Sequence, residues 1–127
     1  MGSVVQNVNP ITLEAGEVLT AADIGRAGIV DTNNQVVGAG AGAYPEVIIR
    51  EIAAAIGDGV VCHHVNSSVR LSVTLAGTVV IGSKLTTDSA GDFIEGTSGD
   101  KYCLVAQIAG ATGESITALV VPADVIG

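Results

Sequence analysis

The stretch IAAAIGDGVV at positions 52–61 decides between a helical and a β fold. Read alone, its alanines fit the end of a helix closed by Gly57, or two strands that meet at a tight turn. A related stretch, IAGATGESIT at positions 108–117, continues into a run rich in β-branched residues that ends at Pro122. Such a run is poor helical material and favours a strand. Both copies therefore predict a strand, a turn of glycine and an acid, and a second strand.

The turn residues of the two copies have matching roles. Gly57 and Gly113 are expected to adopt the positive φ that a tight turn demands, and Asp58 and Glu114 to lie at its exposed tip as solvated acids. A helix over positions 45–57 remains the alternative, because Pro45 suits a first helical position and several isoleucines would share a face.

A second similarity extends this repeat. GEVLTAADIG at 16–25 resembles GSKLTTDSAG at 82–91, so the chain resembles two copies of one unit, at about 12–66 and 69–122. In this alignment the first copy carries about ten extra residues around NNQVVGAGAGA. Turn sequences such as DTNNQ, NSS, DSAGD and TSGD separate many short β-prone runs. We expect one all-β domain over 12–127, a compact sandwich or barrel with Gly-rich turns.

Residues 1–11 are predicted to form an extended N-terminal arm. They carry Val4, Val5, Val8 and Ile11 outside the repeat, and Pro10 is expected to break any strand ladder. Apolar side chains on an arm gain little unless a partner buries them. The four residues are therefore the candidate contacts to a partner.

Composition limits the classes of partner. The 127 residues include 17 glycines and three aromatic residues, Tyr44, Phe93 and Tyr102, and the formal charge is −8. This charge repels phosphate backbones and anionic lipid, so nucleic acid and membrane are disfavoured. No basic and apolar leader precedes the repeat, and no apolar run approaches the ~18 residues of a membrane span, which predicts a soluble, unsecreted chain.

Two motifs carry potential chemistry, and both have a simpler explanation. GAGAGA at 38–43 matches a dinucleotide fingerprint in letters, but it is followed by YPE and not by a clear helix. Cys62 and His64 would share one strand face, with His63 on the other, and a metal would also need Cys103 and an acid. Cysteine and histidine this close on one strand do not match a thiol protease. We expect packed thiols, no cofactor, no metal and no enzymatic activity.

The two stretches AGEVLTAADIGRAGIV and IGSKLTTDSAGDFI, each leading to an Ala-rich segment and a Gly-acid turn, resemble the capsid decoration, or cement, proteins of tailed bacteriophages. The resemblance covers about residues 12–122. It implies an all-β homotrimer on the outer capsid surface of the virion, bridging subunits of the major capsid protein after the shell expands, with no catalytic residues. The alternative is a carbohydrate- or cell-surface-binding β module, which the scarcity of aromatic residues disfavours.

Overall fold

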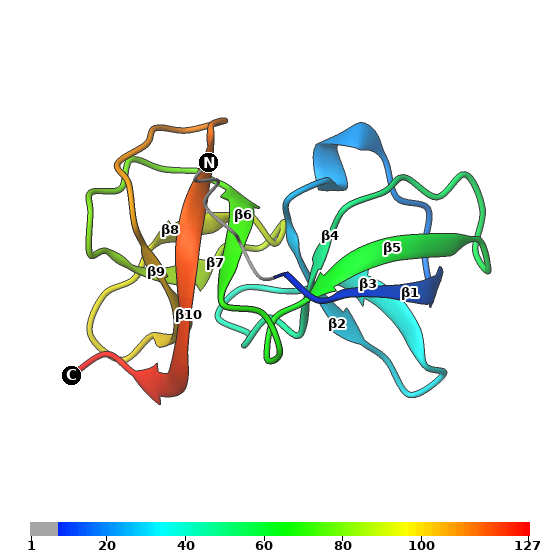
Figure 1. Cartoon of the computed structure of the whole chain (residues 1–127), viewed down its shortest axis with the longest axis horizontal. Helices are drawn as coiled ribbons and strands as arrows, with labels where there is room; N and C mark the ends of the chain where they lie inside the picture. Colours follow the sequence, from blue (N-terminus) through cyan, green and yellow to red (C-terminus); the bar gives the residue numbers. More distant parts are fainter. Residues whose placement is uncertain (1–7) are drawn as a thin grey trace, which may run out of the picture.

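The computed structural model describes residues 8–127, and the protein is all-β over this range (Figure 1), which confirms the predicted fold class. A one-turn 3-10 helix, η1 (Ala21–Asp23), interrupts the first half. The strands are β1 (Pro10–Ala15), β2 (Ala27–Val30), β3 (Gln35–Gly38), β4 (Val47–Ile49), β5 (Gly59–His64), β6 (Arg70–Thr74), β7 (Lys84–Thr87), β8 (Phe93–Glu95), β9 (Lys101–Ala106) and β10 (Ser115–Val125).

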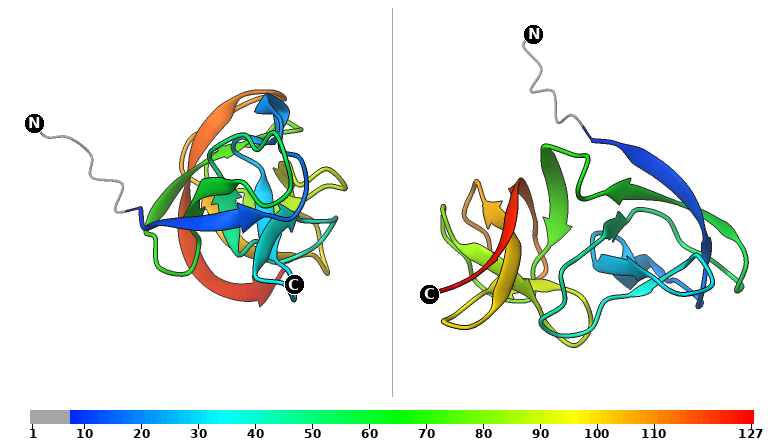
Figure 2. Two further views of the ribbon diagram at one scale, coloured as in Figure 1. Left: turned by 90° about the vertical axis from the view of Figure 1, so that its right-hand side faces the viewer. Right: turned by 90° about the horizontal axis from the view of Figure 1, so that it is seen from below.

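The strands form two sheets that lie side by side along the long axis (Figures 1 and 2). The first is a closed barrel in the order β1-β3-β2-β4-β5, and the second is a five-stranded sheet in the order β6-β10-β9-β7-β8. In the barrel, β1 pairs antiparallel with β5 and parallel with β3. In the second sheet, β6 pairs antiparallel with β10, and Leu75, next to β6, bridges Phe93 of β8 in parallel. The two sheets therefore follow one pairing scheme.

Backbone hydrogen bonds show which positions correspond. Gly25 N–H donates to the Ile49 carbonyl at 2.8 Å, and Gly82 N–H donates to the Ala106 carbonyl at 2.9 Å. Gly25 thus corresponds to Gly82. The sequence alignment, which placed Gly16 on Gly82, was wrong because short Gly-Leu-Thr similarities carry no information about pairing.

The extra residues of the first half also lie elsewhere than predicted. Asp31 and Asp88 occupy matching turns, each carboxylate accepting two backbone N–H groups. The first half is longer than the second between Leu19 and Gly25, where η1 occurs, because the corresponding residues are Val79 and Gly82. It is not longer around the glycines at 38–43. The prediction of about ten extra residues there was wrong.

Two hydrophobic clusters hold the molecule together. The smaller lies within the barrel and includes Val36, Ile49 and Cys62. The larger combines Ile48 of the barrel with Phe93 of the second sheet, together with many other residues from both halves. The two halves therefore share a common core. Full burial of such side chains contributes roughly 1.5–3 kcal/mol each to the stability of the fold.

The N-terminal arm does not extend to residue 11. Val4 and Val5 lie outside the described residues. Ile11 is opposite Cys62 in the β1–β5 ladder, and the partly buried Val8 packs against the larger cluster. Pro10 begins β1 and is paired with β5 but not with β3, a position where its missing N–H costs little. The predictions that Pro10 breaks the ladder and that Val8 and Ile11 belong to an arm were wrong.

The opening stretch is not helical. After β4 the chain turns, Ala53 forms an isolated bridge with Leu19, and β5 begins at Gly59. The helix alternative over 45–57 is therefore excluded. Gly57 has φ 95° and Gly113 has φ 86°, which confirms the predicted positive values.

Candidate functional site

The two acidic turns stabilise themselves. Ala55 N–H donates to Asp58 Oδ2 at 3.1 Å, and Ala111 N–H donates to Glu114 Oε1 at 2.7 Å. Both acids are exposed, as predicted. One turn precedes β5 of the barrel and the other precedes β10 of the second sheet, so each carboxylate serves the geometry of its own turn.

The two cysteines lie in different hydrophobic clusters. Cys62 is fully buried in the barrel cluster and Cys103 is buried in the larger one, both as free thiols. Burial, and then the charge of Glu51, raises the pKa of Cys62 to about 11. Burial alone raises the pKa of Cys103 to about 11. Such thiols stay protonated and are poor nucleophiles at neutral pH.

The histidines next to Cys62 do not complete a site with it. His64 Nδ1 lies 3.0 Å from the hydroxyl of Ser67. His63 Nδ1 is buried without a hydrogen-bond partner, and burial followed by the nearby charge of Arg50 lowers the pKa of His63. Among residues 8–127, no three His, Cys, Asp or Glu side chains are grouped to hold a metal ion.

The glycine-rich stretch connects β3 to β4 within the first half, and it is hydrogen-bonded to β7 of the second half. Thr87 Oγ1 donates to the Gly40 carbonyl at 2.8 Å, and Gly42 N–H donates to the Thr87 carbonyl at 3.0 Å. The stretch leads into β4, a strand, whereas a dinucleotide fingerprint must open a helix. The stretch therefore lacks the helix that a dinucleotide-binding site requires. Across the described residues, no helix is long and apolar enough to span a membrane.

A partly buried ionic contact links the halves and was not foreseen from the sequence. Arg26 donates through Nε and Nη2 to the two carboxylate oxygens of Asp92, at 2.9 and 3.2 Å, and through Nη1 to Asp23 at 3.0 Å. These bonds, with that to Asp92 largest, raise the pKa of Arg26 against the opposing effect of burial. No spacing rule pairs residues so far apart in sequence, so only the fold could reveal the contact.

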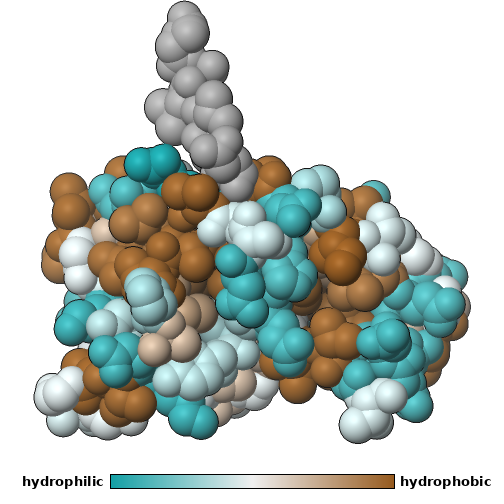
Figure 3. Space-filling view, turned by 60° about the horizontal axis from the view of Figure 1, so that its bottom comes forward, coloured by the Kyte–Doolittle hydropathy of each residue, from teal (hydrophilic) through white to brown (hydrophobic). Residues whose placement is uncertain are grey.

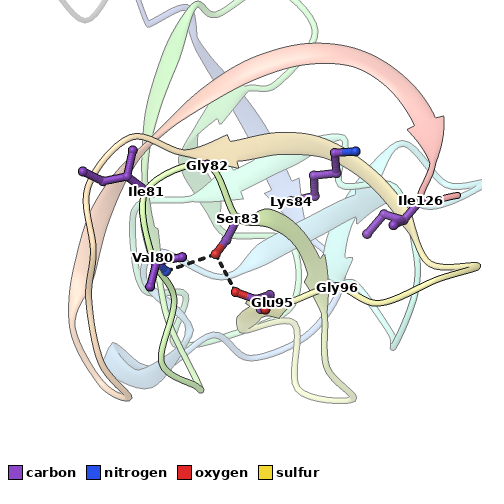
Figure 4. Close-up of a pocket in the computed structure, with 8 residues that line it drawn as sticks. All are labelled: Val80, Ile81, Gly82, Ser83, Lys84, Glu95, Gly96 and Ile126. Carbon is purple, nitrogen blue, oxygen red and sulfur yellow. Dashed lines mark hydrogen bonds between the residues drawn. The ribbon is translucent and has the colours of Figure 1, made fainter.

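A hollow of about 310 Å³ lies at the end of the second sheet (Figure 4). Ser83 Oγ accepts from Val80 N–H at 3.0 Å and donates to Glu95 Oε1 at 2.6 Å, so both polar side chains are engaged with each other. Lys84 Nζ lies 5.1 Å from the ring centroid of Tyr102. The hollow is lined by Val80, Ile81, Gly82, Ser83, Lys84, Glu95, Gly96 and Ile126. The lining therefore combines apolar side chains with a lysine and a hydrogen-bonded Ser83–Glu95 pair.

Large apolar side chains are exposed at several places in the described part of the chain. On the face drawn in Figure 3, hydrophobic residues gather toward the left and form separate smaller groups further right, between hydrophilic ones. Several of them, such as Ile52, Val80 and Ile81, lie outside the strands and next to the isolated bridges of Ala53 and Val79. The exposed residues are Val18, Ile52, Ile56, Val69, Val80, Ile81, Ile108 and Val125.

The fold has a relative among solved structures. No family model matches the chain, and no curated protein matches it by sequence. The N base of head fiber gp8.5 of bacteriophage phi29 matches with a TM-score of 0.67, covering 89% of this chain and 93% of that one, at 14% identity. At this identity the similarity establishes a common fold.

Proposed function

We propose that the chain is a structural protein of a tailed-phage virion that binds the outer surface of the head. In this proposal a homotrimer bridges subunits of the major capsid protein and stabilises the expanded shell, as a decoration or cement protein does, and has no catalytic activity. The observation that carries the proposal is the fold shared, over nearly the whole chain, with a protein named as the base of a phage head fiber.

The physical character of the molecule supports this role. A protein that bridges capsid subunits must transmit force without deforming, and here a common core and the Arg26–Asp92 contact connect the two halves. Exposed apolar side chains provide contact area, since patches of this kind mark interaction surfaces. The buried thiols, and the carboxylates of Asp58 and Glu114 that accept backbone N–H groups of their own turns, favour a binding role over a catalytic one.

The carbohydrate-binding alternative has little to build on. Sugar-binding surfaces commonly stack a pyranose on an aromatic ring, but Phe93 is fully buried here. The ammonium groups of Lys84 and Lys101 lie 5.1 and 5.4 Å from the ring centroids of Tyr102 and Tyr44. These cations occupy ring faces that a sugar would need.

A head-binding assay tests the proposal. Expanded heads would be assembled from the major capsid protein of the phage that encodes this chain, mixed with the purified protein and sedimented. We expect saturable co-sedimentation and a higher temperature of head disruption. Unexpanded heads provide the control and should bind less. Equal recovery of the protein with and without heads would contradict the proposal.

A further inference from the structure

Six of the exposed large apolar side chains form two groups along the chain, each within three positions of a bridge pair. Each group flanks an isolated antiparallel bridge, Leu19 with Ala53 in the first half and Val79 with Gly110 in the second. We name the groups the barrel-end patch (Val18, Ile52 and Ile56) and the sheet-end patch (Val80, Ile81 and Ile108). Their side chains are between 48% and 72% exposed, so neither group contributes to the core.

The two patches lie toward opposite ends of the molecule. In Figure 1 the segments around residues 18 and 52–56 lie in the upper right part, and those around 80 and 108 in the upper left. Val79 bridges Gly110, and Val80 and Ile81 lie in the turn that follows, in which Ser83 N–H donates to the Val80 carbonyl at 3.0 Å. Val80 and Ile81 also border the hollow of about 310 Å³, which gives the sheet-end patch a concave neighbour (Figure 4).

The surroundings of the patches differ in charge. Glu17 precedes Val18, Glu51 precedes Ile52, and Asp58 follows Ile56 by two positions. These three acids are exposed, and none is in a salt bridge within the described residues. Their carboxylates accept only backbone N–H groups there, so no cationic side chain pairs with them beside the barrel-end patch.

The hollow beside the sheet-end patch contains a lysine. Lys84 is exposed, and its ammonium lies over Tyr102 and not in a salt bridge within residues 8–127. The one carboxylate of the hollow, Glu95, accepts a hydrogen bond from Ser83. In a chain with five basic and 13 acidic residues, an exposed cation beside exposed apolar side chains attracts an acid-rimmed apolar surface.

We propose that the barrel-end patch of one copy docks against the hollow and sheet-end patch of the next copy. Because the two surfaces are different, the contact is head-to-tail; such contacts form a closed ring or an open filament, and the proposed homotrimer requires the ring. The inference deepens the proposed homotrimer and rests on it for the number three. The occupant is a second copy because every copy carries both the acid-rimmed apolar surface and its lysine-bearing counterpart.

Two variants, each with one disabled surface, test the contact. Ile52→Asp with Ile56→Asp disables the barrel-end patch, and Ile81→Asp disables the sheet-end patch. All three side chains are more than half exposed, so the fold should persist, which circular dichroism and thermal melting would verify. Val69→Asp is the matched control, because Val69 is 41% exposed and lies outside both patches.

Light scattering and sedimentation velocity give the readout. The unmodified chain and the Val69 control should be trimers, and each patch variant alone a monomer. An equimolar mixture of the two patch variants should form a dimer, because each chain keeps one working surface and the assembly cannot grow further. The mixture must be measured at high concentration, since an open dimer lacks the mutual support of a ring.

A charge reversal tests the electrostatic part. Lys84→Glu should weaken association at least tenfold, whereas Lys101→Glu, also over a tyrosine ring but outside the hollow, should leave it unchanged. The proposal is overturned if the unmodified chain is a monomer, if one patch variant remains trimeric, or if the mixture stays monomeric. Head binding is measured separately, so a ring that forms without binding heads would contradict only the proposed function.

Discussion

Two glycines show how single residues fix the turns of this fold. Gly57 and Gly113 have φ values of 95° and 86°, and a Cβ added at either would meet no atom within 4 Å. The cost of a side chain is therefore backbone strain and not a clash. A β-branched residue is especially disfavoured at such φ.

Gly57→Val and Gly113→Val should each lower the free energy of unfolding by about 1–3 kcal/mol. Urea denaturation would measure it. Gly59→Ala is the control, since its φ lies outside the left-handed region and its Cβ would lie 3.7 Å from Thr12 Cγ2, an ordinary contact. If both valine variants unfold at the same urea concentration as the unmodified chain, the turn assignment fails.

The buried thiols make stability dependent on alkaline pH. The pKa of each cysteine rises from 9.0 to about 11 on folding. The neutral thiol is thus preferred in the folded state, and this contribution is complete below pH 9 and is lost as pH rises toward 11. We expect the urea midpoint to fall over this interval.

The double variant Cys62→Ala, Cys103→Ala isolates the effect. It should be less stable at pH 8, because two buried side chains are shortened, but its midpoint should decline less steeply between pH 9 and 11. Parallel curves for the two proteins would show that the thiols do not contribute.

At the scale of elements, β1 shows that the predicted N-terminal arm ends before residue 10. Its residues Pro10–Ala15 alternate between exposed and buried or partly buried positions, with Ile11, Leu13 and Ala15 facing inward. The barrel closes through β1, because this strand pairs with both β3 and β5. The effect of N-terminal truncation on the melting temperature should therefore change sharply within the first eleven residues.

Removing residues 1–7 should leave the melting temperature nearly unchanged, since every described contact of β1 remains. Removing residues 1–11 deletes the pairs of Pro10 with His63 and of Ile11 with Cys62, and should lower it by several degrees. Differential scanning fluorimetry of both truncations decides this. Equal melting temperatures would contradict the barrel closure by β1.

The all-β class was predictable from the sequence, whereas the strand partners were not. The second copy of the Gly-acid turn favoured a strand-turn-strand structure for 52–61, because its β-branched run ends at Pro122, but the helix over 45–57 stayed open until the structure excluded it. The period-two pattern of Ile11, Leu13 and Ala15 was also visible, but Pro10 was given too much weight. The parallel pairing of β1 with β3, the Arg26–Asp92 contact and the two patches depend on long-range pairing, which no local pattern encodes.

At the scale of the whole molecule, the shared core determines how the protein unfolds. The larger cluster draws Ala27, Ile48 and Val65 from the first half and Leu71 and Phe93 from the second. Losing either half would expose the apolar surface of the other. We expect one cooperative transition, not two.

Calorimetry tests this cooperativity. A single peak with equal calorimetric and van 't Hoff enthalpies is the expected result, and the measurement should be repeated at several protein concentrations because association shifts the midpoint. Two resolved peaks would show that the barrel and the second sheet are independent domains.

The most direct test of the account is a cryo-electron microscopy comparison of phage heads made with and without this chain. Heads from the complete phage should carry an additional density on their outer surface that fits a ring of three copies, contacts neighbouring capsid subunits and is missing when the gene is deleted. Identical outer surfaces in the two reconstructions would contradict the proposal that this protein decorates the head.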